Sequence, residues 1–338
     1  MGRMVGIKDV ATAAGVSVGT VSNVINRPDL VSEETRLRVQ GVIARLGYVR
    51  SESARQLRAG QSRIMALLVL DMGNPFFVDL ARGAERAARR AGLRVIVCNS
   101  SQSTDDEAAY MELFAEQRVR GVLVTPADAT GASVDLLTRS NIPFVLVDRT
   151  VPGADACSVA VDDVEGGTIA VAHLLGAGHT AIAYVGGRHP LQQVRDRRAG
   201  ALQALAAAGL GPEALTDLAV DNLDTASGRD AGSRLIGLVP RPTAVFCAND
   251  LLALGVLQSV YAAGLHVPRD LAIVGYDDIE FAAAAAVPLT SVRQPATDMG
   301  RTAAELLLDE TGKRSDRHEH RQVVFRPELV VRRSTLTL

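Results

Sequence analysis

Residues 7–26, IKDVATAAGVSVGTVSNVIN, constrain the fold of this chain more than any other stretch. The apolar residues of each half recur at helical spacing: Ile7, Val10 and Ala11, then Val21, Val24 and Ile25. Gly15 and Val16 lie between the two sets, and Ser17 stands where it can cap the second helix. The segment therefore predicts a helix, a tight turn at Gly15 and a second helix.

The outward face of the second predicted helix carries small, uncharged residues: Val18, Gly19, Ser22 and Asn23. Such a face is poor for solubility, but it suits contact with base edges in a DNA major groove. An ordinary helical hairpin is the alternative interpretation. The dense order A-x-x-A-G-V-S-x-x-T-V-S-x-V-I-N favours DNA binding over that alternative.

In this pattern the chain resembles the lactose-repressor/galactose-repressor (LacI/GalR) family of bacterial regulators, from residue 5 almost to the carboxyl terminus. The resemblance implies a sequence-specific transcriptional regulator, and we expect a repressor. It also implies that Val18, Gly19 and Asn23 do most of the base reading. Hydroxyl-bearing residues are better placed for phosphates: Ser17, Thr20 and Ser22. Alternatively, Thr20 serves only to start the helix.

The length of 338 residues predicts two or three domains, and an apolar content of 47% suffices for substantial cores. Charge is divided unevenly along the chain. Residues 1–60 carry nine Lys/Arg against five Asp/Glu, whereas the whole chain has a net charge of -2. A basic head on an acidic remainder fits local contact with phosphates.

Cys98, Cys157 and Cys247 are far apart in apolar surroundings, so we expect reduced core residues of a cytoplasmic protein. Metal-ligand spacings such as CxxC or HExxH do not occur, and we expect no metal and no cofactor. Three histidines are interpreted as surface or capping residues: His173, His179 and His189. His318 and His320 lie in the polar run KRSDRHEHR, which predicts a solvated loop. No apolar run reaches the roughly 18 residues of a membrane span, so we expect no membrane partner.

The predicted DNA-binding domain covers residues 1–50. Residues 26–28 connect its second helix to a third one, which Ser32 is expected to cap and Gly47 to end. One face of the third helix is apolar: Leu37, Val39, Val42, Ile43 and Leu46. Three short helices around one small core therefore form the predicted head.

Residues 51–61 form the predicted linker, which is too short for a stable isolated helix. The family resemblance implies a hinge helix whose two copies in a dimer pack over the minor groove, with a leucine wedged into the central base step. Leu57 stands at that position, and Ala54 lies one turn earlier on the packing side. Arg55 and Arg58 can reach phosphates. A plain flexible linker is the alternative.

From residue 62 to residue 338, near-continuous apolar strands alternate with helices such as 75–92 and 197–208, which indicates parallel sheets covered on both faces. Two such runs predict two doubly wound α/β subdomains behind an all-α head. The resemblance implies the periplasmic-binding-protein type, with crossings near residues 162, 291 and 323. The expected effector and dimerisation domain thus divides as follows: residues 62–162 plus 292–323, and residues 163–291 plus 324–338.

Ligands of open parallel sheets gather at the carboxyl ends of the strands. The residues near those ends combine carboxylates, amides, guanidinium groups and aromatic rings: Asn74, Phe76, Phe77, Asp148, Arg149, Arg197, Asn249, Asp277 and Gln294. This mixture suits a neutral sugar, because hydroxyls donate and accept while the C–H faces lie on aromatic rings. These positions resemble those of ribose-type sugar binders. Leu223 departs from that pattern, since such binders often have an aromatic residue there.

We therefore expect a repressor of a carbohydrate-utilisation operon, controlled by a small sugar bound between the two subdomains, with a pentose such as ribose favoured. A homodimer on pseudo-palindromic double-stranded DNA is the expected assembly. The alternatives are a hexose, purine or nucleoside effector, or a sugar-binding protein of a transport system, which the head argues against. The sequence has no paired nucleophile and base and no dinucleotide fingerprint, so an enzyme is not expected.

Overall fold

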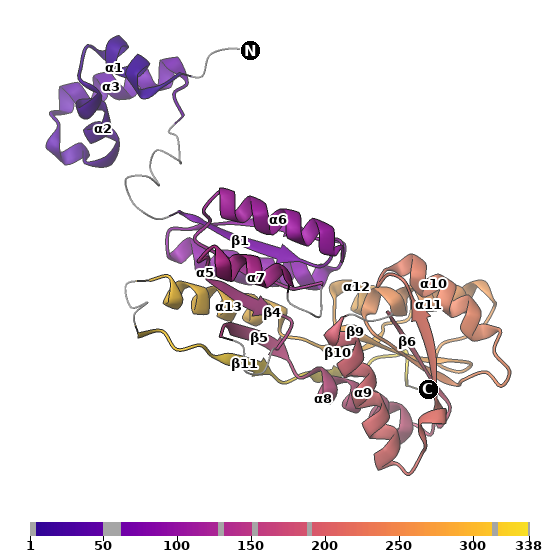
Figure 1. Ribbon diagram of the computed structural model, residues 1–338. Coiled ribbons are helices and arrows are strands. Elements are labelled where there is room, and N and C mark those ends of the chain that lie inside the picture. Colours follow the sequence, from indigo (N-terminus) through magenta and orange to yellow (C-terminus); the bar gives the residue numbers. More distant parts are fainter. Residues whose placement is uncertain are drawn as a thin grey trace. The chain divides into compact units, whose positions relative to one another are not determined.

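The computed structural model describes residues 5–49, 62–127, 132–150, 155–187, 191–312 and 317–336. The chain divides into two compact units, Met1–Ser62 and Arg63–Leu338, which are taken separately below (Figure 1). Within the described ranges, no helix has both the length and the apolar character that crossing a membrane would require.

The first unit packs its helices around one small apolar core. Its elements are α1 (Ile7–Ala14), α2 (Val18–Asn26), the 3-10 turn η1 (Pro28–Leu30) and α3 (Glu33–Leu46). Val10, Val21 and Val39 are completely buried, one from each α-helix. Gly15 ends α1 with a φ of 66°, which is a left-handed conformation that favours glycine. The predicted helix, tight turn and helix are therefore confirmed.

Two details of α3 differ from the prediction. Ser32 occupies the N-cap position, but its hydroxyl donates to Thr35 Oγ1 at 3.0 Å and caps no backbone amide. Leu37 is 59% exposed, whereas Val39 and Val42 are buried. Two residues rotate an α-helix by about 200°, so Leu37 lies on the face opposite Val39.

The first six-stranded sheet of the second unit has the order β11-β5-β4-β3-β1-β2, and all its strands are parallel. Its strands are β1 (Ile64–Val69), β2 (Arg94–Asn99), β3 (Gly121–Val124), β4 (Phe144–Val147), β5 (Cys157–Val161) and β11 (Gln322–Phe325). Helices α5 (Pro75–Arg90) and α13 (Ala296–Glu310) cover one face, and α6 (Thr104–Glu116) and α7 (Ala132–Arg139) cover the other. Leu67 and Leu68 accordingly belong to separate cores on opposite faces.

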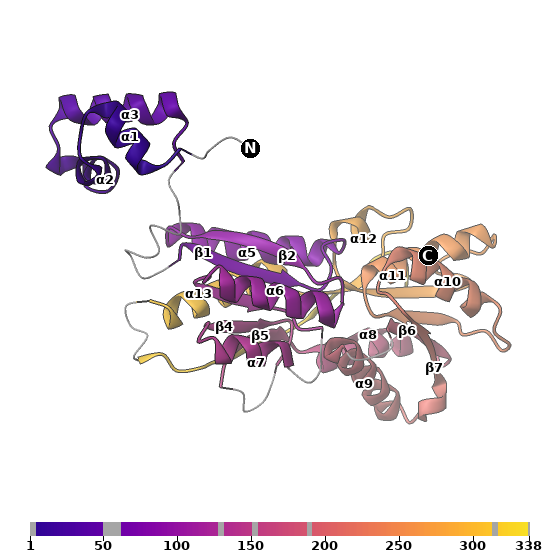
Figure 2. The same cartoon turned by 45° about the horizontal axis from the view of Figure 1, so that its top comes forward.

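The second six-stranded sheet has the order β12-β10-β9-β8-β6-β7. Its strands are β6 (Ile182–Gly187), β7 (Leu215–Val220), β8 (Ala244–Cys247), β9 (Ala272–Asp277), β10 (Thr290–Arg293) and the antiparallel β12 (Glu328–Val330). Helices α8 (Asp163–Gly176) and α9 (Gln192–Ala207) lie on one face, and α10 (Thr225–Ile236) and α11 (Asp250–Ala262) lie on the other (Figure 2). The short elements η2 (Pro212–Ala214) and α12 (Glu280–Ala284) complete this half. The two doubly wound halves confirm the predicted fold class.

The chain passes between the sheets after β5, after β10 and after β11. The second and third passages come later than the sequence suggested. Residues 292–293 belong to the second sheet because β10 pairs with β9 through Arg293 and Asp277. Residues 324–325 belong to the first sheet because β11 pairs with β5 through Phe325 and Val161. Helix α9 begins at Gln192, five residues before the predicted helix at 197–208.

Three of the helix pairs that cover the sheets cross at glycines: α5 with α13, α8 with α9, and α10 with α11. A Cβ on Gly300 of α13 would clash with the carbonyl oxygen of Leu80 on α5, and a Cβ on Gly83 would clash with that of Thr297. The other two crossings repeat this arrangement: Gly167 with Gly200 for α8 and α9, and Gly228 with Gly255 for α10 and α11. Backbone therefore meets backbone at these three crossings, and added side-chain atoms would not fit there.

We predict that Gly300→Ala lowers the free energy of unfolding by about 1–3 kcal/mol, because the added methyl group overpacks a helix crossing. Gly176→Ala is the matched control, since a Cβ at that exposed end of α8 meets nothing within 4 Å. The control should leave stability unchanged or raise it by up to about 1 kcal/mol. Urea unfolding followed by circular dichroism measures both. Equal stability of the two variants would contradict the account.

Candidate functional site

A cleft lies between the two halves of the second unit, at the carboxyl ends of both sheets, with an empty volume of about 410 Å³ that is partly open to solvent. Nine of the ten positions singled out from the sequence line it: Asn74, Phe76, Phe77, Asp148, Arg197, Leu223, Asn249, Asp277 and Gln294. Arg149 is half-buried and is not among the lining residues. Asp148, with a φ of 58°, turns the chain at the end of β4, and the next residue does not follow it into the cleft.

Four lining residues were missed by the sequence reasoning: Leu70, Asp71, Gln102 and Gln193. Leu70 and Asp71 directly follow β1, so the rule of strand ends applied consistently would have included them. Gln193 precedes Arg197 by four residues, which places both on one face of α9. Gln102 lies in the turn after β2, where it and Ser101 both have left-handed φ values, and that turn had no clear signal in the sequence.

Two hydrogen bonds join the halves across the cleft. Asn74 Nδ2 donates to Asp277 Oδ2 at 2.8 Å, and Gln193 Nε2 donates to Asp148 Oδ2 at 3.2 Å. Asn74 is held in place because it also caps α5, with its Oδ1 accepting from the Phe76 amide at 3.0 Å. The arrangement shown is therefore a closed one in which each acceptor across the cleft is a carboxylate.

Arg197 is fixed by buried partners of the second half. Its Nε donates to Asp163 Oδ1 at 2.7 Å, and its Nη1 donates to the Ala248 carbonyl at 2.6 Å. Its guanidinium carbon lies 3.7 Å from the centre of the Tyr276 ring. These contacts hold the planar donor fork where it lines the cleft, in a geometry suited to hydroxyl or carbonyl oxygens.

The cleft contains hydrogen-bond acceptors that lack donors within the described part of the chain. Asp148 Oδ1 and Gln294 Oε1 are buried there without a partner. Burial raises the pKa of Asp148 well above its ordinary value, and nearby Asp163 raises it further, although Arg197 lowers it. Asp148 and Asp277 also have positive φ values of 58° and 103°. Backbone strain together with unsatisfied acceptors is typical of a site that binds a ligand rich in donors.

The remaining wall of the cleft is apolar. The rings of Phe76 and Phe77 meet edge to face, with centroids 5.0 Å apart and an interplanar angle of 74°. Leu223 comes from the second half, where its carbonyl accepts from Asn249 Nδ2 at 2.9 Å. Asn249 also caps α11 through the Leu252 amide. The cleft thus combines aromatic and aliphatic surface with a polar, carboxylate-rich side.

The surface of α2 has the exposure that the sequence predicted for a groove-binding helix. Gly19 and Asn23 are exposed, and Val18, Thr20 and Ser22 are half-exposed. Ser17 caps the helix, because its Oγ accepts from the Thr20 amide at 3.0 Å. Val18 packs partly against the core of the head. The other positions expected to touch DNA lie outside the described residues: Ala54, Arg55, Leu57 and Arg58.

The polar run near the carboxyl terminus differs from the predicted solvated loop. The side chain of His318 is only 4% exposed, and His320 is 30% exposed. Both rings approach Cys157, with Sγ to His318 Nε2 at 3.3 Å and Sγ to His320 Nδ1 at 3.8 Å. The prediction was wrong because the run begins just after α13 and continues into β11, which pairs with β5.

Comparisons with known proteins agree with this architecture. The model of bacterial regulatory proteins of the lacI family matches residues 6–51, and that of the periplasmic binding protein-like domain matches residues 171–335. The HTH-type transcriptional repressor PurR of Photobacterium profundum is 34% identical over 337 residues, which cover 99% of this chain and 100% of that protein.

Two solved structures are similar over most of their length. A LacI family transcriptional regulator from Enterococcus faecium with bound ribose has a TM-score of 0.74 and 30% identity, covering 81% of this chain and 99% of that one. The lac repressor dimer bound to operator and the anti-inducer ONPF has a TM-score of 0.83 and 27% identity, covering 99% and 100%. The chain belongs to the lacI family, and it is a DNA-binding transcriptional repressor.

We predict that stability falls as the pH rises from about 4 to about 6. Burial raises the pKa of Asp277 to about 6 against an ordinary value of 3.8, although Arg197, Asn74 and Gln294 lower it. Because the folded state binds this proton more tightly than the unfolded chain does, its contribution is present at low pH. About 3 kcal/mol is then lost through this interval.

The measurement is urea unfolding at several pH values for the native sequence, Asp277→Asn and the control Asp298→Asn. Asp298 lies on the surface beside Arg301, with its side chain 57% exposed. Asp277→Asn should flatten the decline, and Asp298→Asn should retain it. A decline of the same slope in all three proteins would contradict the assignment.

Proposed function

We propose that the amino-terminal unit reads its operator through the exposed face of α2, with Asn23 as the residue that discriminates between bases. An exposed amide can hold adenine through two hydrogen bonds, a contact worth about 1–3 kcal/mol. Gly19 lets the helix approach the groove closely, and half-exposed Val18 can contact a thymine methyl group. The hydroxyl groups of the neighbouring Ser22 and Thr20 donate hydrogen bonds to DNA phosphates in this proposal.

Asn23→Ala should relax specificity at one position of each half-site, because alanine cannot make the paired hydrogen bonds. Binding to the preferred operator should weaken about 5–150-fold, and binding to operators altered at that position should change little. Gln40→Ala removes an exposed amide from α3 and is the matched control. Fluorescence anisotropy on a set of singly altered operators measures this. An equal loss of affinity for every operator would contradict the assignment of Asn23.

For the cleft we propose a small neutral sugar, with a pentose such as ribose favoured. Asp148 Oδ1 and Gln294 Oε1 supply acceptors for hydroxyl protons, and Arg197 supplies donors. The Phe76 and Phe77 pair offers one wall for the C–H face of a ring, and Leu223 offers an aliphatic surface instead of a second aromatic one. The observation that carries this proposal is the pair of unsatisfied buried acceptors. The ribose complex of the related regulator supports it.

A purine is the second candidate, because the curated relatives have the name PurR. A planar nucleobase gains most from stacking on both of its faces. Leu223 provides less stacking for the second face of a nucleobase than an aromatic ring would. The carboxylates can still accept from ring N–H groups, so the two ligand classes differ mainly in how they use the apolar wall.

Thermal unfolding with a panel of ribose, other pentoses, hexoses, hypoxanthine and guanine tests the choice, since a ligand of the folded state raises the melting temperature. Ribose should raise it for the native sequence. Asp148→Asn should weaken ribose binding about 10–150-fold, because an amide NH2 replaces one of the carboxyl oxygens that accept from the sugar hydroxyls. The surface variant Asp79→Asn is the control. A shift by hypoxanthine or guanine and none by any sugar would replace the pentose with a purine.

We propose a homodimer in which a second copy covers the exposed edge of the first sheet. Strand β2 ends that sheet, and its Ile96 and Val97 are 44% and 38% exposed. An unpaired apolar edge strand of this kind is normally covered. The lac repressor dimer on its operator supports this assembly. Two heads on one dimer fit a pseudo-palindromic site.

In this proposal the ligand regulates DNA binding by changing the balance between open and closed arrangements of the cleft. Donors from a sugar would satisfy Asp148 and Gln294 only when both halves are in place. A ligand acts through its different affinities for the two arrangements, typically about 1–3 kcal/mol. Residues 51–61, with Leu57 as wedge and Arg55 and Arg58 on phosphates, stay the predicted link to the operator.

A further inference from the structure

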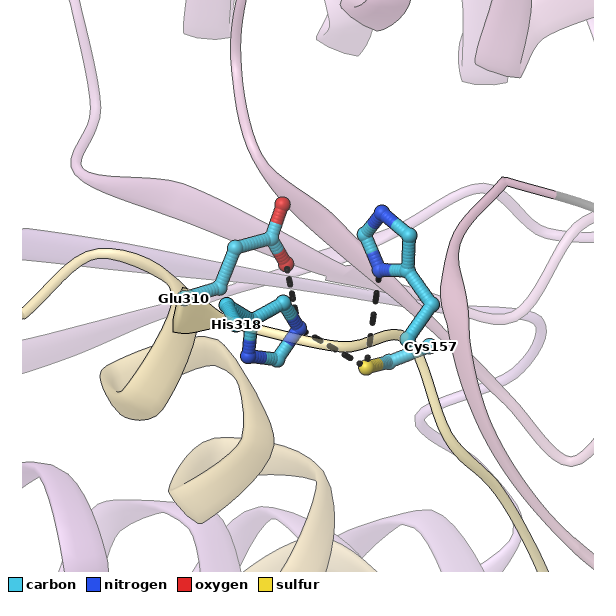
Figure 3. Close-up of side chains that lie close together, drawn as sticks. Cys157, Glu310 and His318 are labelled. Carbon is cyan, nitrogen blue, oxygen red and sulfur yellow. Dashed lines mark hydrogen bonds and ion pairs between the residues drawn. The ribbon is translucent and has the colours of Figure 1, made fainter. Parts of the chain in front are cut away.

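The structure brings four side chains with metal-binding atoms to one point, far from the cleft. Cys157 begins β5, Glu310 ends α13, and His318 and His320 precede β11. One ligand atom from each lies within 4.8 Å of all the others. Figure 3 shows the Glu310 carboxylate, the His318 ring and the Cys157 sulfur pointing toward one another. We propose that Cys157, Glu310, His318 and His320 bind one divalent transition-metal ion, with Zn²⁺ favoured.

Three of the six distances between the ligand atoms are close to those around a tetrahedral ion, and all six are within 4.8 Å. Bonds of about 2.0–2.3 Å hold tetrahedral ligand atoms about 3.3–3.8 Å apart. Cys157 Sγ lies 3.3 Å from His318 Nε2 and 3.8 Å from His320 Nδ1, and His318 Nε2 lies 3.9 Å from Glu310 Oε2. Thiolate, imidazole and carboxylate are all ligands that Zn²⁺ accepts. Four protein ligands without an open position are typical of a structural site.

The outer nitrogen of each ring faces a carboxylate. His318 Nδ1 lies 3.2 Å from Asp309 Oδ2, and His320 Nε2 lies 3.5 Å from Asp155 Oδ1. Metal-binding histidines commonly give their second nitrogen to such a carboxylate, which sets the ring and its tautomer. The backbone amide of Arg321 also donates to Cys157 Sγ at 3.3 Å, which stabilises a thiolate.

The four inner atoms of the cluster can all act as electron-pair donors. When each ring donates its outer N–H to a carboxylate, its inner nitrogen carries a lone pair. These two nitrogens, the sulfur and Glu310 Oε2 face one another. Glu310 Oε2 is in fact buried without a hydrogen-bond donor among the described residues. A cation at the centre satisfies every one of these acceptors at once.

The place of the cluster in the fold suggests what the ion does. Cys157 and the start of β4 lie at the edge of the first sheet opposite the cleft, because Val145 pairs with Cys157 while Asp148 follows the end of β4. An ion here ties the end of α13 to β5 and to the segment before β11. It therefore stabilises the first half of the second unit without entering the cleft.

The test uses the untagged full-length protein, stripped of metal with a chelator and titrated with Co²⁺. We expect one Co²⁺ per chain, with the thiolate-to-cobalt charge-transfer absorption and the intense visible bands of a tetrahedral site. One equivalent of Zn²⁺ should remove both spectral features. Zn²⁺ should also raise the melting temperature of the stripped protein.

Cys157→Ser should abolish the charge-transfer band and weaken Co²⁺ binding by at least about 100-fold. Asp309→Asn keeps all four ligands and should weaken binding about 10–100-fold while the band persists. The matched controls are Cys98→Ser and His266→Gln, which alter a cysteine and a histidine outside the cluster. Both controls should bind Co²⁺ like the native sequence.

His320→Gln alters the most exposed ligand and repeats the test if Cys157→Ser fails to fold. It should weaken Co²⁺ binding by at least about 100-fold and leave the circular dichroism spectrum unchanged. Two results would overturn the proposal. One is the absence of a charge-transfer band in the native sequence. The other is Co²⁺ binding that survives both Cys157→Ser and His320→Gln, which would place the ion elsewhere.

Discussion

Two hydrogen bonds that end on buried carboxylates hold the cleft closed, and the proposed regulation depends on them. Asn74 reaches Asp277 and Gln193 reaches Asp148, each from the opposite half of the unit. Neither hydrogen bond fully offsets the cost of removing its carboxylate from water, since the pKa of both Asp277 and Asp148 remains raised. Burying these carboxyl groups in the closed arrangement is therefore costly, and a ligand that brings hydroxyl donors stabilises that arrangement most.

In the proposed regulation, this local balance changes how the two halves are placed relative to each other. Both halves contain helix pairs that cross at glycines, so backbone meets backbone there and those crossings can yield little. The proposed ion at Cys157 would stiffen the first half further, at the edge away from the cleft. The proposed movement would act between the halves, where the chain passes after β5, β10 and β11.

Much of this architecture could be predicted from the sequence. Apolar runs separated by helical patterns gave the parallel sheets, and the rule that ligands gather at strand ends found nine of the thirteen lining residues. It also named Arg149, which is not among the lining residues; the left-handed φ of Asp148 turns the chain just before it. The cluster around Cys157 could not be predicted from the sequence. Its cysteine and histidines come from segments about 160 residues apart, which meet only through the pairing of β5 and β11.

The central claim is that ligand binding in the cleft and operator binding by the head are coupled. Coupling between two binding equilibria is reciprocal. The direct measurement is a pair of affinities in the full-length protein: operator affinity with and without saturating ribose, and ribose affinity with and without saturating operator. The account predicts that both change by the same factor, about 5–150-fold. Ribose that binds in the cleft and leaves operator affinity unchanged would contradict it.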